Sequence, residues 1–335
     1  MKILLSALCF LVIVTITASA QEKDFSKLSG PYLGQKHSGT LPQIFAPGIV
    51  STSNPDICIS FTPDGKEVYY TMGGQPHSVI LFMKEEKGVW SSPEVAPFSG
   101  MYSSECQLSP DGNTMYFCAG IPASGSGNPK GNWDLFKVDR INGEWGKPLR
   151  LPYPLASDEY SADCPSVAAN GNIYFYSSNY PGGFGKGDIY VSRLINDKYQ
   201  TPENLGANIN TEFYDMDPFI APDENYIIFS SIRPGGQGEN DLYISFKNSD
   251  GSWGMAVNMG KEINSYAHEI HPYVSRDGKY LFFCSKRRIS YKRYSERPLN
   301  FKEKMEWTKK PGNELEDIYW VDAKLIEELR RQYQK

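Results

Sequence analysis

The sequence lacks the patterns on which most helical and nucleic-acid-binding proteins are recognised. Segments with the 3.6-residue periodicity of an amphipathic helix are almost absent from its 335 residues, which disfavours helical bundles and Rossmann-type folds. A basic stripe is missing too, because 34 Lys and Arg against 39 Asp and Glu, mixed along the chain, give a formal charge of -5. A nucleic-acid-binding surface needs clustered positive charge to displace counterions. We therefore expect no nucleic-acid partner.

Several catalytic signatures are also absent. The chain has no GxSxG nucleophile elbow, no HExxH helix and no Walker loop, and its glycine-rich stretches at 182–187 and 235–238 precede strand-like rather than helix-like runs. These absences disfavour serine hydrolases, zinc proteases and NTPases. No CxxC pair is present either. We expect the cysteines that follow the N-terminal segment to be buried and inert, namely Cys58, Cys106, Cys118, Cys164 and Cys284.

The only long hydrophobic run stands at the N-terminus. Lys2 precedes an apolar stretch over 3–16, and the small residues Ala18, Ser19 and Ala20 follow. This order is typical of a cleavable secretory signal, and the run is too short for a permanent membrane anchor. We predict a signal peptide over 1–20, an extension over 21–40, and an exported protein, periplasmic or secreted, without a membrane anchor.

A motif that repeats about every fifty residues dominates the remaining sequence. Each copy has a short apolar run, a turn of Asp-Gly type and a second run rich in aromatic residues, which together indicate a β-hairpin. A glycine- or proline-rich loop and a third strand-like run, such as DLYISF, follow each hairpin. Four of the five copies continue into a fourth such run. The turn residues of the five copies are Asp64, Asp111, Asn170, Asp223 and Asp277.

Four antiparallel strands per repeat are typical of a β-propeller blade. The fifth repeat lacks its fourth strand, but the segment 41–52 resembles that strand and precedes the first hairpin. We therefore predict an all-β fold over 41–322, a propeller of five four-stranded blades in which an N-terminal strand completes the last blade. A short C-terminal helix is expected over 323–335, where Asp322 precedes LIEELRRQ.

The repeats resemble those of exported WD40-like (PD40) proteins related to the propeller domain of TolB. The resemblance rests on the SPDG and SRDG turns at 109–112 and 275–278, and on the paired segments IFSSIRPGG...NDLYIS and FYSSNYPGG...GDIYVS. It implies the propeller fold over nearly the whole chain after residue 41. The family includes protein-interaction scaffolds, enzyme-associated propellers and carbohydrate lyases, so the function has to be argued from the site.

Propeller geometry predicts which residues meet at one mouth of the ring. The start of each innermost strand and the end of the second strand lie on the same face, opposite the hairpin turns. Counting back six positions from each turn gives one residue per blade near the neck of the channel: Cys58, Glu105, Cys164, Asp217 and His271. The neighbouring acids and loops add tyrosines and arginines to the same mouth. A concave, tyrosine-rich funnel with convergent polar groups is the default candidate for a binding site.

Our first hypothesis is that this funnel binds, and processes if it is catalytic, an acidic oligosaccharide. Elimination on a uronate requires a neutralised carboxylate and a base that removes the adjacent proton; hydrolysis would use two carboxylates, with Asp56, Glu105 and Asp217 as candidates. The candidate catalytic residues are His271, Tyr214, Tyr266, Glu105 and Asp217. The candidate substrate-binding residues are Arg233, Arg287, Tyr102, Tyr160, Tyr180, Asp163 and Asp215. The residues do not identify a cofactor, but His271, Asp217 and Glu105 could hold a divalent metal as its candidate ligands.

Our second hypothesis is a non-catalytic scaffold of TolB type that binds an envelope protein through one face. It is supported by the family resemblance and by the absence of catalytic signatures. The first hypothesis is supported by a resemblance to oligogalacturonate lyases. These enzymes are propellers of the same repeat family and have histidine-rich metal sites. The sequence departs from them in its blade number and in having only 4 histidines. Under both hypotheses we expect a monomer.

Overall fold

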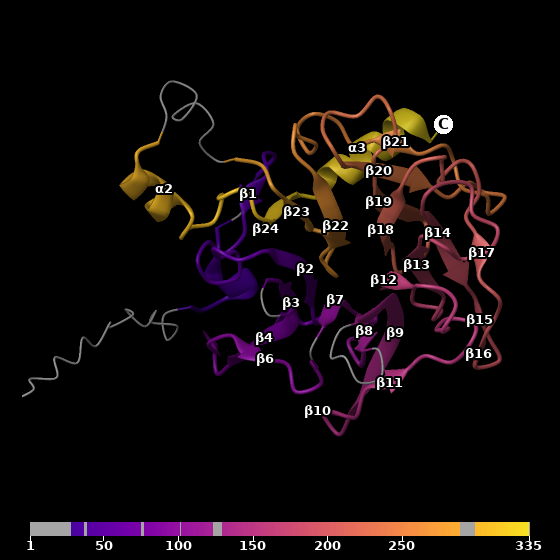
Figure 1. The fold of residues 1–335 in the computed structure, drawn as a ribbon, viewed down its shortest axis with the longest axis horizontal. Coiled ribbons are helices and arrows are strands. Elements are labelled where there is room, and N and C mark those ends of the chain that lie inside the picture. Colours follow the sequence, from indigo (N-terminus) through magenta and orange to yellow (C-terminus); the bar gives the residue numbers. More distant parts are fainter. Residues whose placement is uncertain are drawn as a thin grey trace, which may run out of the picture.

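The structure is a computed structural model that describes residues 28–36, 39–74, 77–100, 102–122, 129–288 and 299–334. For residues 121–122 and 129–132 it describes the backbone alone. The expected signal peptide lies outside the described residues. Five antiparallel sheets form a ring, and the innermost strand of each sheet faces its centre (Figure 1). The innermost strands are β2 (Asp56–Phe61), β7 (Ser103–Leu108), β12 (Asp163–Val167), β18 (Asp215–Ile220) and β22 (Glu269–Val274).

Each blade continues outward from its innermost strand by antiparallel pairing. The second strands are β3 (Glu67–Met72), β8 (Thr114–Pro122), β13 (Ile173–Ser177), β19 (Tyr226–Ser231) and β23 (Tyr280–Ser285). The third strands are β4 (Val79–Glu86), β9 (Pro129–Ile141), β14 (Asp188–Ser192), β20 (Asp241–Phe246) and β24 (Asp317–Asp322). The outermost strands are β6 (Glu94–Val95), β11 (Leu149–Arg150), β17 (Glu203–Asn204), β21 (Val257–Asn258) and β1 (Gln43–Ile44). The predicted propeller of five four-stranded blades is confirmed.

Short additional elements decorate the ring. Two-residue strands β5 (Val89–Trp90) and β10 (Glu144–Trp145) extend the hairpins of β4 and β9, and β15 (Leu194–Ile195) pairs with β16 (Lys198–Tyr199). The helical segments are the 3-10 turn η2 (Pro31–Gly34), α2 (Phe301–Trp307) and α3 (Lys324–Tyr333). Neither these helices nor the turn, in the part of the chain that is described, combines the length and apolarity needed to cross a bilayer.

The fifth blade is completed by the N-terminal strand, as predicted from the sequence. Ile44 of β1 pairs with Tyr319 of β24, and the next residue, Phe45, is fully buried. The Phe45 ring contacts Phe282 and Trp320, each with a centroid distance of 5.2 Å. Strand pairing and aromatic packing therefore hold the two distant parts of the chain in one sheet, and the closed ring leaves only short, protected sheet edges.

The hairpin turns form because aspartate side chains satisfy the backbone locally. In the first blade, Asp64 Oδ1 accepts hydrogen bonds from the Thr62 hydroxyl at 2.7 Å and from the Lys66 backbone N–H at 3.1 Å. The next residue, Gly65, has a φ of 68°, which glycine adopts without steric cost. Equivalent turns recur along the ring, so their residues mark the face opposite the predicted mouth.

In the fourth blade a glutamate replaces the turn glycine. Glu224 has a φ of 57°, and its carboxylate accepts hydrogen bonds from Asn172 and Tyr174 of the third blade, both at 2.8 Å. Lys247 lies 3.2 Å from the same carboxylate. Burial opposes ionisation, yet these hydrogen bonds and Lys247 lower the pKa of Glu224. A strained turn position is thus used to join two blades.

Candidate functional site

The innermost strand of every blade contains one bulge at its channel end. The hydrogen-bond register shifts there in all five blades. The residue at each bulge has a positive φ although it is not glycine: Cys58 (48°), Glu105 (55°), Cys164 (51°), Asp217 (54°) and His271 (50°). Such a conformation costs on the order of 1 kcal/mol per residue and turns the side chain away from its usual alternation. These are the five positions obtained by counting back from the hairpin turns.

The residues after these bulges explain part of the local geometry. Pro165, Pro218 and Pro272 each follow a bulge residue directly. Proline has no backbone N–H, so it leaves no donor unpaired where the ladder is interrupted. A Cys-Pro, Asp-Pro or His-Pro pair at the same position of three repeats is the sequence signal of this ring.

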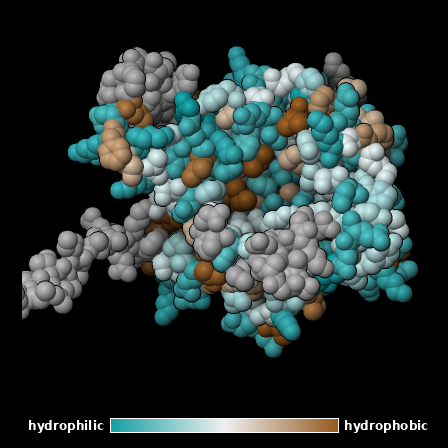
Figure 2. Space-filling model, viewed as in Figure 1, coloured by the Kyte–Doolittle hydropathy of each residue, from teal (hydrophilic) through white to brown (hydrophobic). Residues whose placement is uncertain are grey.

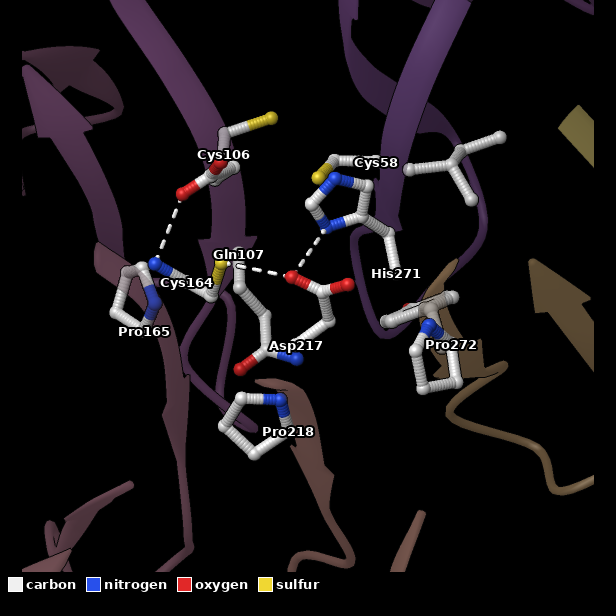
Figure 3. A pocket seen from close by; sticks show the side chains of 12 residues that line it. Cys58, Cys106, Gln107, Cys164, Pro165, Asp217, Pro218, His271 and Pro272 are labelled. Carbon is white, nitrogen blue, oxygen red and sulfur yellow. Dashed lines mark hydrogen bonds and ion pairs between the residues drawn. The ribbon is translucent and has the colours of Figure 1, made fainter. Parts of the chain in front are cut away.

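The bulge residues surround a small cavity at the neck of the channel. It measures about 30 Å³, and all five bulge residues line it (Figure 3). A cavity needs about 10 to 15 Å³ of such space to hold one water molecule. The neck can hold a water molecule or an ion, and it is too small for an organic ligand to pass.

A wider funnel of about 410 Å³ lies on the neck. Glu105, Cys164, Asp217 and His271 belong to both cavities, so they form the floor of the funnel. The other lining residues are Asp163, Tyr176, Tyr214, Met216, Ile232, Asn240, His268 and Ile270. The volume falls in the range of small-molecule sites. One face of the ring is drawn in Figure 2, where a few hydrophobic residues lie near the middle of a mostly hydrophilic surface.

On the funnel floor, one oxygen of Asp217 is the meeting point of two side chains. The Cys164 thiol donates a hydrogen bond to Asp217 Oδ1 with a sulfur–oxygen distance of 3.0 Å, and His271 Nδ1 lies 3.5 Å from the same oxygen (Figure 3). The second oxygen, Oδ2, accepts a hydrogen bond from the Ser230 hydroxyl at 2.8 Å. The Asp217 carboxylate is therefore fixed from both sides.

Glu105 and Asp163 form the neighbouring part of the floor. Glu105 Oε2 accepts hydrogen bonds from the Cys164 backbone N–H at 2.8 Å and from the Cys118 thiol at 3.0 Å. Burial, followed by the charges of Glu105 and Asp217, raises the pKa of Asp163 well above its ordinary value. Its Oδ1 atom is buried without a hydrogen-bond partner among the described residues. Burial also raises the pKa of the Cys164 thiol.

The floor contains two groups of side chains with metal-ligand chemistry. Cys164, Asp217 and His271 form one, and Glu105, Asp163 and Cys164 form the other; within each, the ligand atoms lie within 4.8 Å of one another. The sequence grouped Asp217, His271 and Glu105 as metal ligands. The structure places Asp217 and His271 together, adds Cys164 between them, and places Glu105 in the adjoining group.

The two arginines expected to bind substrate lie outside the funnel lining. Arg233 Nη2 lies 2.6 Å from Asp215 Oδ1, and Nε donates to Ser231 Oγ at 2.9 Å. The guanidinium carbon is 4.6 Å from the centroid of the Tyr243 ring. Arg233 and Asp215 thus form a buried pair inside the fourth blade. Both were expected to bind substrate, but neither lines the funnel.

Arg287 repeats this arrangement in the fifth blade. Its Nη2 lies 3.0 Å from Glu269 Oε1, its Nε donates to Ser285 Oγ at 3.1 Å, and its guanidinium lies over Tyr319. The physical reason is shared: a fully buried carboxylate at the start of the innermost strand needs a counter-ion, and the arginine two residues after a strand serine can reach it. Both arginines are paired with carboxylates inside their own blades. Neither lines the funnel, where they were expected to bind an anionic ligand.

The expected tyrosines divide into two sets. Tyr214 lines the funnel. Tyr102 packs on His77, and Tyr160 on Tyr180 with a centroid distance of 5.1 Å, outside both cavities. Tyr266 is 54% exposed and is not part of either lining.

Asp56, a candidate for hydrolysis, also lies outside the two cavities. It is fully buried, and its Oδ2 accepts hydrogen bonds from the backbone and the hydroxyl of Thr52. Burial raises the pKa of Asp56 to about 7 despite these hydrogen bonds. This aspartate organises the entry to β2 and has no access to the funnel.

Tyr176 was not expected at the site from the sequence, and Cys164 was expected at the neck but was given no chemical role. Tyr176 lies at an ordinary aromatic position of a second strand, and nothing in its local sequence distinguishes it. Cys164 was assigned to the inert core because it has no CxxC partner, although the count that selected Asp217 and His271 had already placed it in the same ring. That count was the available signal.

Comparisons with known proteins support the fold and stop there. No family model and no curated protein matches the chain. An α-L-arabinofuranosidase structure from Lactobacillus brevis is similar with 14% identity and a TM-score of 0.50, over 82% of this chain and 91% of that one. A TolB structure from Acinetobacter baumannii has 15% identity and a TM-score of 0.48, over 81% of this chain and 57% of its own length.

A thermostable family-43 glycoside hydrolase is a further neighbour, with 14% identity and a TM-score of 0.47 over 69% of this chain and 83% of that one. Identities this low carry no information on ligand or activity. The function has to be argued from the funnel and its floor.

Proposed function

We propose that the funnel binds the end of a uronate-containing oligosaccharide and that the protein is exported to reach it. The observation that carries the proposal is the funnel itself, about 410 Å³ in volume, with tyrosines in its wall and carboxyl groups on its floor. Tyrosine rings pack against the apolar faces of sugars, and carboxylates accept hydrogen bonds from their hydroxyls. Because the neck is narrow, a ligand can enter the funnel from one side only, which favours binding of the end of an oligosaccharide over binding of its middle.

The acidic character of the ligand is supported by a cation beside the funnel. Lys186 Nζ lies 5.9 Å from the centroid of the ring of Tyr214, which lines the funnel. Lys186 is exposed and has room to turn toward a sugar carboxylate. In this proposal Lys186 replaces Arg233 and Arg287, the arginines that were expected to bind the carboxylates of the ligand.

Two reactions fit the funnel, and each has its own observation. For elimination, Tyr214 lines the funnel, where its phenolate form would take the proton next to a sugar carboxylate as the bond to the leaving glycosidic oxygen breaks. For hydrolysis, Glu105 and Asp163 place two carboxyl groups side by side on the floor, with oxygens no more than 4.8 Å apart, and glycosidases use such a pair of acids. Elimination creates a conjugated double bond that absorbs in the ultraviolet, whereas hydrolysis creates reducing ends without it.

The test compares thermal unfolding with and without a panel of uronate-containing and neutral oligosaccharides, together with both product assays. A ligand that binds the folded state raises the melting temperature. Tyr214→Ala should abolish the rise, and Tyr266→Ala, which alters an exposed tyrosine outside the lining, should preserve it. Equal effects of the two variants, or no rise with any sugar, would overturn the proposal and favour a scaffold that binds an envelope protein.

A further inference from the structure

We infer that the funnel floor is a binding site for a zinc-type transition-metal ion, held by Cys164, Asp217 and His271. These residues occupy the bulge positions of three consecutive blades, the third, fourth and fifth. Each side chain is turned into the channel by the same backbone conformation. The inference depends on contacts between these side chains and is independent of the proposed sugar ligand.

The distances between the candidate ligand atoms match a tetrahedral site. With metal–sulfur bonds of about 2.3 Å and metal–nitrogen or metal–oxygen bonds of about 2.0 to 2.2 Å, neighbouring ligand atoms in a tetrahedron lie roughly 3.4 to 3.6 Å apart. Asp217 Oδ1 lies 3.0 Å from Cys164 Sγ and 3.5 Å from His271 Nδ1. Cys164 Sγ and a ring nitrogen of His271 lie within 4.8 Å of each other. Displacements of up to about one ångström would therefore place all three atoms around one ion.

The chemistry of the three ligands selects the class of metal. A thiolate and an imidazole favour zinc and its neighbours in the transition series, whereas calcium and magnesium require a shell made mainly of oxygen atoms. On binding, the ion replaces the thiol proton, which leaves to solvent. One thiolate and one carboxylate then balance the charge of a divalent ion, so the assembled site is neutral in a buried position.

The surrounding contacts supply what a metal site needs outside its ligands. Ser230 holds Asp217 Oδ2 at 2.8 Å and leaves Oδ1 directed at Cys164 and His271. Such outer contacts orient the ligands of known metal sites. An independent sign of an unfilled polar position is Asp163, whose buried Oδ1 has no partner among the described residues.

Three protein ligands leave one tetrahedral position open. The three residues line both the neck and the funnel, so the open position faces space that is accessible to a ligand. This is the arrangement of catalytic rather than structural zinc sites. If the proposed function is correct, a sugar carboxylate or a water molecule occupies this position, and the ion supplies the charge neutralisation that Arg233 and Arg287 do not.

The experiment uses the purified chain after treatment with a chelator. Cobalt(II) is titrated into it, and the absorption of a tetrahedral cobalt–thiolate site is followed; zinc is then added to displace the cobalt. We expect saturation at one ion per chain, displacement by zinc, and no competition from calcium or magnesium. Absence of a thiolate band, or displacement by calcium, would overturn the inference. This arm uses the unaltered protein, so it does not depend on the folding of any variant.

Variants then locate the ion. Cys164→Ser should remove the thiolate band, and His271→Gln should weaken binding strongly, whereas Cys284→Ser, an equally buried cysteine outside both ligand groups, should leave the titration unchanged. Ser230→Ala should weaken binding by about tenfold to a hundredfold while the band persists. Unchanged binding in both Cys164→Ser and His271→Gln would place the ion elsewhere and refute the site. Metal binding without any sugar effect would refute only the proposed function.

Discussion

Replacement of Arg233 by methionine separates a structural arginine from a ligand-binding one. The side chain of Asp215 is 0% exposed, and Arg233, 14% exposed, is its counter-ion at 2.6 Å. Removing one partner of a buried ion pair typically costs about 3 to 5 kcal/mol, because the remaining charge stays buried without compensation. The guanidinium also lies over Phe229 and Tyr243, which adds about 1 kcal/mol of cation–π attraction. We expect Arg233→Met to lower the free energy of unfolding by about 4 to 6 kcal/mol.

The chain offers a matched control on the preceding blade. Arg193 and Glu203 form an ion pair of 3.3 Å whose side chains are 45% and 57% exposed. Pairs of this kind contribute about 0 to 1 kcal/mol. Arg193→Met should therefore change stability by less than 1 kcal/mol. Arg233→Lys should fall between the two, because lysine keeps the charge but loses the planar fork that binds Asp215 and Ser231 together.

Urea denaturation followed by tryptophan fluorescence measures all three variants. The midpoint should shift strongly for Arg233→Met and hardly for Arg193→Met, with unchanged slopes. If the two methionine variants have the same stability, Arg233 does not compensate the Asp215 charge and our reasoning is refuted. A stable Arg233→Met variant that loses its response to acidic oligosaccharides would restore the substrate-binding role expected from the sequence.

Three further predictions concern closure, packing and pH. Phe45→Ala should destabilise the ring by about 3 to 5 kcal/mol in urea, whereas Leu41→Ala, at a residue 62% exposed, should be nearly neutral; similar costs would mean that the strand β1 does not close the ring. Gly238→Ala should lower the melting temperature because its added Cβ would overlap a backbone carbonyl oxygen, and Gly100→Ala should not, since its Cβ meets nothing nearer than 3.9 Å. Burial raises the pKa of Asp317 from 3.8 to about 7, despite a hydrogen bond from the Gly312 backbone. Folding therefore favours the protonated form, and the contribution of Asp317 to stability is complete below pH 4 and declines as the pH rises through 7. The stability of Asp317→Asn relative to the unaltered protein should thus increase from pH 5 to pH 8, and a constant difference in unfolding free energy over that range would contradict this assignment.

The fold was predictable because its signals are local and repeated. An aspartate such as Asp64 fixes its hairpin within a few residues, and five such turns at regular spacing define the number of blades. The closure by 41–52 followed from a missing strand at one end and a surplus strand at the other. None of these steps requires knowledge of which side chains meet across blades.

The site was predictable only in part because its contacts are not local. Counting from the turns located the ring of bulges, since every blade uses the same backbone path. The partners of Arg233 and Arg287 come from positions 18 residues earlier in the chain, and the sequence does not show which acid a nearby arginine will neutralise. The sequence also does not show that Asp56, a candidate catalytic carboxylate, is fully buried. In the fold its side chain accepts hydrogen bonds from Thr52 and does not reach the funnel.

The absence of a CxxC motif led to a wrong expectation for one of the cysteines. A thiol without a CxxC partner is usually inert, and Cys106 and Cys284 fit that rule. Cys164 is as buried as a core residue, yet it lies between a histidine and two carboxylates. Its neighbours come from three other blades, so no pairwise spacing in the sequence displays them.

The repeated bulge also bears on how such a protein changes its chemistry over time. Each blade presents one side chain to the axis from a backbone path that is the same whether the residue is Cys58, Glu105 or His271. A single substitution at one of these five positions therefore alters the set of side chains at the axis, while the surrounding sheets keep their strand pairing. Design of new sites in this ring can therefore begin with the side chains at five known positions and leave the rest of the chain untouched.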